Sequence, residues 1–478
     1  MSLKKRGVHL LLGPVFFFLI SVCLGKTGVM DLTAAKGIGT AVWMIYWWVT
    51  RPVDITVTAL LPGVINAIFD IVPMDNVISQ YASGSIILIF GSCLLTAPWS
   101  EIGLDKRISL KALSLIGPSM KSQITVWLLA AIVLSNMMPN VVVVAIFTPI
   151  AVSMLAAAGY KDIRKCEAAT PILCAIAWGS QVGGAGTPLG GAMNITAIAF
   201  IEEYTGREFM YVDWLSRMLP YTVIATIAVL VTMLLKPMKV NSLEGTREYF
   251  VKCYRDLGPV KKDEKISLVL FVAAMLGSFL RPLYADLIPG LVPAYLFLIL
   301  GFANFVIVSV ERRELLLTWE KAQKEVMWGM LLLFAGGLAL GQILTGSGAN
   351  DAIAGVISSV HLTGGIGTIF IFTLFACIIS EMTNSTVSAA VTLPIVIGVT
   401  QKLGLNPIPY VFTTAMGMNF ESILPVSVRA ISVSYGLDPD KLLKNGLVVA
   451  LVRMLVAVAV GYIIMQLWPG FGTLNETL

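Results

Sequence analysis

Charged residues are scarce in this chain of 478 residues: Asp, Glu, Lys and Arg make up only 13% of it, against 57% hydrophobic residues. A soluble globular protein has about 25% charged and about 45–50% apolar residues. The apolar residues come in long runs, which at about 20 residues per membrane-spanning helix allow at most roughly 13 spans. The composition predicts an all-α polytopic membrane protein and excludes a cytosolic enzyme, a nucleic-acid binder and a disordered chain.

Residues that support metal, redox or ATP chemistry are scarce too. The two histidines, His9 and His361, cannot build a histidine metal site, and the six cysteines contain no CxxC pair. The chain has no GxxxxGK[ST] loop, so it cannot hydrolyse ATP itself. We therefore expect no enzyme activity, no cofactor and no resident metal. A channel, or a permease subunit driven by a separate ATPase, remains an alternative to a secondary transporter.

The N-terminus indicates how the chain lies in the membrane. Lys4, Lys5 and Arg6 precede the first apolar run, and the small-residue pattern of a signal-peptide cleavage site is missing. Basic residues favour the inner side of a membrane. We expect a retained first helix, a cytoplasmic N-terminus and a multi-pass protein of a bacterial plasma membrane. The net charge of +5 fits basic inner loops and requires no nucleic-acid partner.

The chain divides into two similar halves. The longest polar stretch, 236–265, holds eight basic and five acidic residues and predicts a cytoplasmic loop between a first repeat, 1–235, and a second, 266–478. The stretch 135–150 matches 380–395, with Pro149 opposite Pro394, and Pro188 matches Pro425 in a later block. Duplicated halves with matching broken segments are typical of secondary transporters, whose repeats are often inverted.

Two short apolar runs are interrupted by glycine or proline. The runs at 83–99 and 327–346 predict re-entrant hairpins, with two tilted spanning helices as the alternative. Broken helices are expected at about 122–204 and 364–436, followed by a C-terminal helix. With the remaining scaffold helices this makes about 11 transmembrane helices plus two re-entrant hairpins.

The first candidate site is a pair of polar breaks inside apolar runs. One break ends at Pro139-Asn140, and its counterpart in the second half is Asn384-Ser385-Thr386. The helix that starts after each break directs its positive dipole end at the break, which favours an anion. Two such ends meeting at the membrane midplane would bind a dianion. The alternative is a helix kink whose free backbone groups bond to Ser and Thr side chains, without a ligand.

The second candidate site is the glycine-rich segment 183–194. Gly190 and Gly191 would allow a ligand to approach the backbone closely, and Asn194 ends the segment. Glycines that serve helix packing are the alternative.

The counterpart segment in the second half, 424–429, contains Ser427 and the always-charged Arg429. A charge at membrane depth costs about 2.5–3.5 kcal/mol on insertion scales and usually has a role. Arg429 could face a substrate carboxylate, pair with Glu381 or Glu421, or reach the membrane interface.

These segments resemble those of the divalent anion:sodium symporter family. The stretch GGAGTPLGGAMN at 183–194 is similar to the family's Gly-Gly-x-Gly-Thr…Asn segment, and NSTVSAAVTLP at 384–394 to its Ser-Asn-Thr motif. The resemblance covers essentially the whole chain and is closest to bacterial and plastid-type dicarboxylate exchangers. It implies a homodimer with scaffold and transport domains, an elevator mechanism, and di- or tricarboxylate substrates such as C4-dicarboxylates and 2-oxoglutarate.

The chain departs from the family pattern where the family binds sodium. Of the first Ser-Asn-Thr motif only Asn140 is kept, and in the second Asn384 and Ser385 are exchanged while Thr386 is kept. If Arg429 replaced a sodium charge, that cation could not leave with the substrate, and the empty carrier would hold an uncompensated charge. We therefore expect a sodium-independent antiporter, with a sodium-coupled symporter as the alternative. The predicted substrate-binding residues are Asn140, Gly190, Gly191, Asn194, Asn384, Ser385, Thr386, Ser427 and Arg429.

Overall fold

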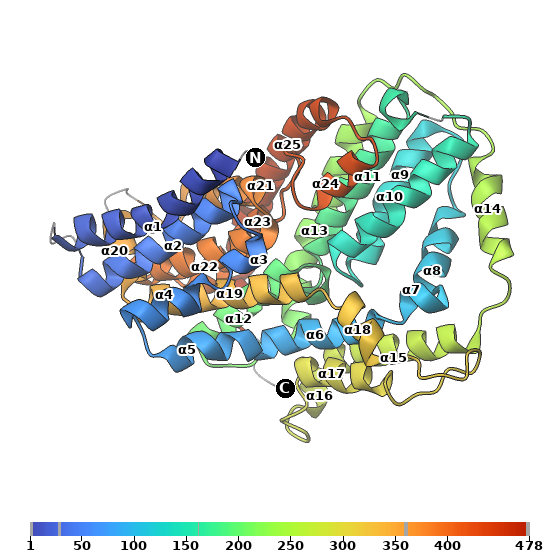
Figure 1. Cartoon of the computed structure of the whole chain (residues 1–478). Helices are drawn as coiled ribbons and strands as arrows, with labels where there is room; N and C mark the ends of the chain where they lie inside the picture. Colours follow the sequence, from blue (N-terminus) through green and yellow to red (C-terminus); the bar gives the residue numbers. More distant parts are fainter. Residues whose placement is uncertain (1–2, 27–29, 161, 358–361, 475–478) are drawn as a thin grey trace.

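The computed structural model describes residues 3–26, 30–160, 162–357 and 362–474, so His361 lies outside the described part. Within those residues the chain is built of helices, and its only extended pairings are two isolated β-bridges (Figure 1). The all-α class predicted from composition is therefore confirmed.

The first half begins with a series of helices that runs from one end of the molecule to the other (Figure 1). Their bounds are α1 (Leu3–Lys26), α2 (Leu32–Thr50), α3 (Ile55–Thr58), α4 (Leu61–Phe69), α5 (Met74–Ile78), α6 (Gly84–Thr96), α7 (Trp99–Ile102) and α8 (Leu104–Leu113). The helices that follow carry the first polar break and the glycine-rich segment. They are α9 (Met120–Ser135), α10 (Asn140–Ala157), α11 (Ala169–Gly184), α12 (Ala192–Thr205) and α13 (Tyr211–Leu234).

The second half has a comparable series of elements. It starts with α15 (Lys262–Phe279), α16 (Arg281–Tyr284), α17 (Pro293–Ala303), α18 (Trp319–Glu325), α19 (Trp328–Gly346) and α20 (Ala349–Ile357). It continues with α21 (Ile366–Met382), α22 (Ser385–Lys402), α23 (Pro407–Met418), α24 (Val428–Ser434) and α25 (Pro439–Leu467). Pro149 and Pro394 lie the same number of residues after the first residue of α10 and of α22, which fits the predicted duplication.

Several helices have the length and composition of membrane spans. Six stretches in the described residues qualify, and four shorter apolar helices accompany them. The six are Lys5–Lys26, Met74–Ile102, Asn140–Ala157, Tyr211–Leu234, Trp328–Gly346 and Pro439–Leu467. The multi-pass architecture follows from this set, whereas the expected total of about 11 spans and the inverted relation of the halves stay predictions.

The two runs expected to be re-entrant hairpins each continue as helix without reversing direction. The expectation of hairpins in these two runs is therefore wrong. Run 327–346 is the continuous helix α19, and run 83–99 lies within the apolar stretch Met74–Ile102. Several of their glycines serve close packing instead of breaking the helix. A side chain at Gly91 would meet the backbone of Leu298 in α17, and one at Gly336 would meet Ala59.

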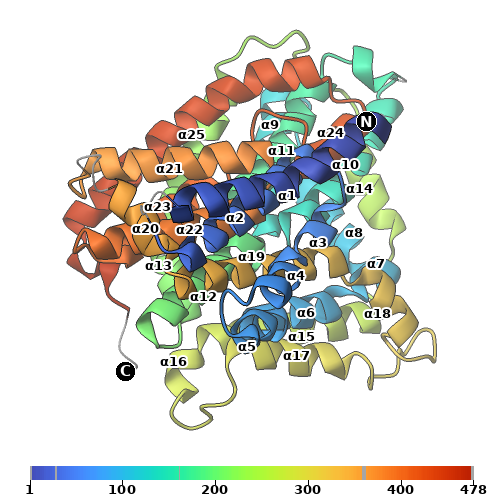
Figure 2. The same ribbon diagram turned by 60° about the vertical axis from the view of Figure 1, so that its left-hand side comes forward.

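The structure places its helical hairpins at the polar breaks instead. Helices α9 and α10 are joined by the turn 136–139, and α21 and α22 by Thr383-Asn384. The members of each pair pack against each other. Figure 2 shows α21 and α22 lying close to α23, beside the N-terminal helices. Each predicted break is thus the tip of a helix–turn–helix unit.

The polar stretch 236–265 is more ordered than a plain loop. It contains α14 (Thr246–Asp256) and the first turn of α15. Arg107 of α8 pairs with Glu264 at 2.8 Å and donates to the carbonyl oxygens of Leu257, Gly258 and Pro259. The connection between the halves is therefore fixed to the first half.

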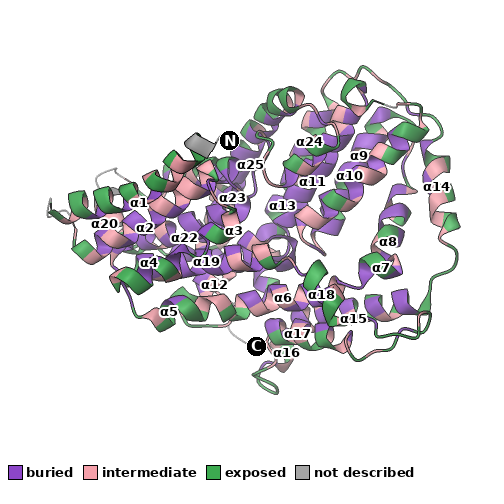
Figure 3. Cartoon of the chain, viewed as in Figure 1, coloured by how far each residue is buried: buried purple, intermediate pink, exposed green. Residues whose placement is uncertain are grey.

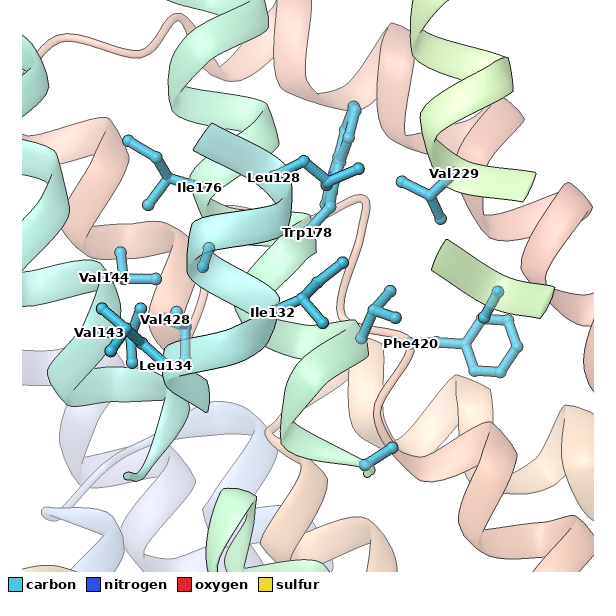
Figure 4. Packing of buried hydrophobic residues seen from close by; sticks show 14 of the residues in the cluster. Leu128, Ile132, Leu134, Val143, Val144, Ile176, Trp178, Val229, Phe420 and Val428 are labelled. Atoms are coloured by element: carbon cyan, nitrogen blue, oxygen red, sulfur yellow. The ribbon is translucent and has the colours of Figure 1, made fainter. Parts of the chain in front are cut away.

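The core is deepest around the helices that flank the breaks. Every residue of α11 after its first turn is buried, as is almost all of α22 and α23 (Figure 3). A close view shows α9, α10, α11 and α24 meeting through apolar side chains (Figure 4). Val428, for example, lies near Val143 and Val144. This packing holds the tip of the first hairpin beside the segment that carries Arg429.

Candidate transport site

The two hairpin tips are joined by a chain of hydrogen bonds. Asn140, the first residue of α10, donates from Nδ2 to Oε1 of Gln181 at 2.8 Å. Gln181 donates in turn to Oε2 of Glu421 at 2.9 Å, and the other oxygen of Glu421 accepts from the amide of Ser385 at 2.5 Å. The polar breaks predicted in separate halves of the sequence therefore lie close together in the fold.

The second tip exposes hydroxyl groups without protein partners. Asn384 caps α22 by accepting from the amide of Val387 at 2.9 Å, so its oxygen is already in use. Ser385 and Thr386 are each about 8% exposed, and no hydrogen bond joins their hydroxyls to another described residue. Of the predicted second motif, Ser385 and Thr386 are therefore free to bind a ligand, while Asn384 has a structural role.

The glycine-rich segment packs against the first hairpin. A side chain at Gly190 would meet the carbonyl oxygens of Ser135 and Gly184, and the Gly190 amide already donates to Thr187. A side chain at Gly191 would also meet the Gly184 carbonyl. These glycines allow two backbones to approach each other, which was the alternative weighed for them. They position the loop beside the tip.

Two buried amide oxygens lie unsatisfied next to this loop. Asn194 donates from Nδ2 to the carbonyls of Gly184 and Thr187, both at 2.7 Å, while its Oδ1 has no donor. Asn419, directly after α23, donates to the carbonyl of Gln181, and its Oδ1 also lacks a donor. Buried acceptors without donors are rare, and each such group calls for an explanation such as a bound ion.

Arg429 forms a buried ion pair with Glu381. Its Nη1 lies 3.0 Å from Oε2 of Glu381, and the arginine is fully buried. The same carboxylate accepts from the backbone amides of Ser422, Ile423 and Leu424. Of the roles considered for Arg429 from the sequence, the structure contains the pairing with Glu381. Its Nε and Nη2 have no hydrogen-bond partner among the residues that the structure describes.

Ser427, two residues before Arg429, has an unusual backbone conformation. Its φ of 54° and ψ of −130° lie in a region that residues other than glycine rarely adopt. Such strain costs of order 1–3 kcal/mol and clusters at functional sites. The Ser427 side chain also approaches the Glu421 carboxylate.

Sequence reasoning missed three members of this site. Gln181 and Asn419 are polar residues in apolar runs, at the end of α11 and just after α23. Arg453 of α25 is another fully buried arginine, and it donates to the carbonyls of Phe420 and Asn419 at 2.8 and 2.7 Å. A charge within the apolar run 444–468 was the available signal for Arg453, by the argument already applied to Arg429.

A small cavity lies on the other side of the first tip. It has a volume of about 110 Å³ and is lined in part by Met138, Pro139 and Leu189, and by α6 and α7. Asp105 and Glu325 also line it. Burial raises the pKa of Asp105 above its usual range, and the nearby Glu325 adds to the rise. Among the residues that line it, these two are acidic and none is basic.

Comparison with known proteins places this site in a family context. The model of the citrate transporter family matches residues 45–417, which is most of the chain. The chain belongs to the citrate transporter family. It is accordingly a membrane transporter and not an enzyme, as expected, and the resemblance to divalent anion:sodium symporters is confirmed.

Curated relatives of the chain cover nearly its full length. It is 24% identical over 95% of its residues to the sodium-dependent dicarboxylate transporter SdcS of Staphylococcus saprophyticus, of which 90% is covered. It is 25% identical over 98% of its residues to SdcS of Staphylococcus aureus, of which 93% is covered.

Solved structures are similar in fold alone. The chain matches the MtrF efflux pump of Neisseria gonorrhoeae with a TM-score of 0.54 and 14% identity, over 90% of this chain and 94% of that one. It matches the YdaH transporter of Alcanivorax borkumensis with a TM-score of 0.50 and 12% identity, over 82% and 88% of the two chains.

Proposed function

We propose that this transporter carries di- and tricarboxylates, C4-dicarboxylates and 2-oxoglutarate among them, across the membrane together with sodium. The observation that carries this proposal is the charge balance at the site. Glu381 and Glu421 offset Arg429 and Arg453, all four of them buried. A bound dicarboxylate would add two negative charges, and burying net charge at membrane depth is costly. Cations that bind with the substrate would offset it.

This balance removes the basis for sodium-independent antiport. That expectation assumed that Arg429 leaves an uncompensated positive charge in the empty carrier. Because Glu381 pairs with Arg429 at 3.0 Å, the empty carrier holds no such excess at this position. The names of the SdcS relatives likewise favour the symport alternative over the antiport expectation.

The proposed substrate site lies between the hairpin tips. The hydroxyls of Ser385 and Thr386 at the start of α22 would bind one carboxylate, aided by the positive end of that helix. Asn140 at the start of α10 would bind the other by exchanging its bond to Gln181 for one to the substrate. Ser427 and Arg429 would support the second tip from behind the Glu421 and Glu381 carboxylates.

The proposed sodium ligands are oxygens of the unwound segments. Carbonyl oxygens of broken helices commonly hold coupling ions in transporters. Asn194 Oδ1 and Asn419 Oδ1 would contribute side-chain oxygens, since neither accepts from a donor among the described residues. The cavity lined by Asp105 and Glu325 would raise the local sodium concentration beside the first tip.

We further propose, from the family resemblance, a homodimer in a bacterial plasma membrane with a cytoplasmic N-terminus and an elevator motion of the hairpin-bearing part.

A thermal-shift series tests the proposal on the purified protein. Succinate, malate, 2-oxoglutarate and citrate are added in sodium chloride or in choline chloride of equal concentration. Binding to the folded state raises the melting temperature by an amount that grows with the logarithm of the ligand concentration relative to the dissociation constant. We expect at least one carboxylate to raise it markedly more in sodium than in choline. Equal shifts in the two salts would contradict sodium coupling, and no shift with any acid would contradict the substrate class.

A further inference from the structure

A second cavity lies at the end of the molecule where α11 and α25 begin and α13 ends. It has a volume of about 180 Å³. Its floor is apolar and includes Cys174, Trp178 and Met233, and three lysines, Lys236, Lys239 and Lys441, line its rim. Neither the proposed substrate site nor the proposed sodium ligands involve these residues.

The rim carries a net positive charge. Glu167 is the acidic residue in the lining, and it lies 3.1 Å from Lys239 and 3.3 Å from Lys441. These two lysines hold the pKa of Glu167 below its usual range, so the carboxylate stays charged. Lys236 donates to Oδ1 of Asn445 at 2.8 Å, which uses one of its three N–H groups. Three lysines against one glutamate leave an excess that suits an anionic group.

The cavity is separated from the proposed transport site. Trp178 is 2% exposed, and its indole N–H donates to the carbonyl of Ser422 at 3.2 Å. Its ring therefore stands between the cavity and the segment that Glu381 binds. An anion on the lysines would be held at the surface and would not lie on a path to the hairpin tips.

The helices beside the cavity expose apolar faces that lead up to it. On α13 Ile227 and Val231 are exposed, and Leu235, directly before Lys236, is 79% exposed. On α25 Leu451 and Leu455 are 66% and 70% exposed. Because α13 and α25 pack against each other, these exposed faces lie on neighbouring helices that the hydrocarbon of a bilayer would cover. Lys236 follows the end of α13 and Lys441 lies in the first turn of α25, so both lysines lie where these helices end.

Further basic residues gather at the same end. The loop before α11 contributes Arg164 and Lys165, and α25 contributes Lys444. Asp162, which lies 3.7 Å from Lys165, and Asp438 and Asp440 at the start of α25 offset part of this charge, and basic residues remain in excess. An excess of basic residues marks the cytoplasmic side of a membrane protein, and the inner leaflet is rich in anionic lipid.

We propose that this cavity binds the headgroup of an anionic phospholipid of the inner leaflet. The phosphate would lie among Lys236, Lys239 and Lys441, and the acyl chains would cover the exposed apolar faces of α13 and α25. Basic pockets between membrane helices on the cytoplasmic side are a recognised type of lipid site. The site fixes the end of α13 to the start of α25 and to α11.

Lipid titration of the full-length protein in nanodiscs tests this proposal. Tryptophan fluorescence, to which Trp178 contributes, would be followed as phosphatidylglycerol replaces phosphatidylcholine. We expect saturable binding of phosphatidylglycerol. In the variant Lys236→Gln/Lys441→Gln the apparent affinity would fall about 30-fold, since each lysine near the surface contributes about 1 kcal/mol. Native mass spectrometry of the same variant would count retained phosphatidylglycerol and keep the test independent of fluorescence.

Lys444→Gln is the matched control. Lys444 lies on α25, one turn from Lys441, is exposed, and does not line the cavity. We expect it to retain wild-type affinity within about 3-fold. A loss of about 5-fold in Lys444→Gln, which is the loss per lysine in the double variant, would indicate diffuse attraction to an anionic surface and would overturn the proposal. Inorganic phosphate alone should not reproduce the fluorescence change, and if it did, the site would bind free phosphate and not lipid.

Discussion

Arg429 and Glu381 form an ion pair of 3.0 Å in which the arginine is fully buried. The carboxylate also accepts from three successive backbone amides, 422–424, that lead to the strained Ser427. The pair therefore fixes the unwound segment between α23 and α24. It connects the second hairpin, which carries Glu381, to the helix that packs on the first hairpin.

Breaking this pair from one side should destabilise the protein strongly. Arg429→Met leaves the Glu381 carboxylate buried without its cation, which costs about 3–5 kcal/mol. The double variant Arg429→Met/Glu381→Gln removes both charges and should recover much of that loss. Thermal unfolding in detergent checks this, with Arg6→Met, near the N-terminus, as a control for removal of one arginine. A double variant no more stable than Arg429→Met would show that the pairing is not the reason for the loss.

Two substitutions at Ser427 separate the effect of backbone strain from the effect of the hydroxyl group. Ser427→Gly and Ser427→Ala both remove the hydroxyl beside Glu421, but glycine adopts a positive φ without steric cost. We expect the glycine variant to be more stable than the alanine variant by about 1 kcal/mol. Denaturant unfolding of the two variants side by side provides the comparison. Equal stabilities would mean that the segment carries no strain.

The role of Gly190 can be tested with a single methyl group. Gly190→Ala would push against the carbonyl oxygens of Ser135 and Gly184, so the loop must move away from the first tip. Overpacking of this kind costs about 1–3 kcal/mol, and transport should fall with it. Gly84→Ala is the control, because a side chain there meets nothing within 4 Å. Normal uptake by Gly190→Ala would remove this loop from the site.

The proposed sodium ligand Asn194 has a natural control in the same chain. Asn194 and Asn304 are both buried asparagines that donate to backbone carbonyls and leave Oδ1 without a donor. Asn304 lies after α17 and donates to the carbonyl of Leu94 in α6 and not to the glycine-rich loop. We expect Asn194→Ala to raise the sodium concentration needed for half-maximal uptake at least about tenfold, and Asn304→Ala to leave it unchanged. Parallel shifts in both variants would count against Asn194 as a ligand.

The sequence predicted the local features of this protein well. Apolar runs define the helical class, and the positions of Pro139 and Asn384 predict where α10 and α22 begin, because proline and a capping asparagine act on their own backbone. The polar breaks and their duplication were visible for the same reason.

Features that depend on neighbours in space could not be predicted. Glycine in a helix is compatible with a break or with close packing, and only the contact of Gly91 with α17 decides between them. The link from Asn140 through Gln181 to Glu421 joins residues more than 200 positions apart, and no local pattern indicates it. The choice of partner for Arg429 likewise depended on where the two halves meet.

Uptake of radiolabelled succinate into proteoliposomes without internal substrate tests sodium-coupled transport most directly. Under an inward sodium gradient the account predicts accumulation that collapses when choline replaces sodium outside. If uptake instead required internal carboxylate and proceeded equally without sodium, the transporter would be an exchanger, and the account of charge balance at Arg429 and Glu381 would be contradicted.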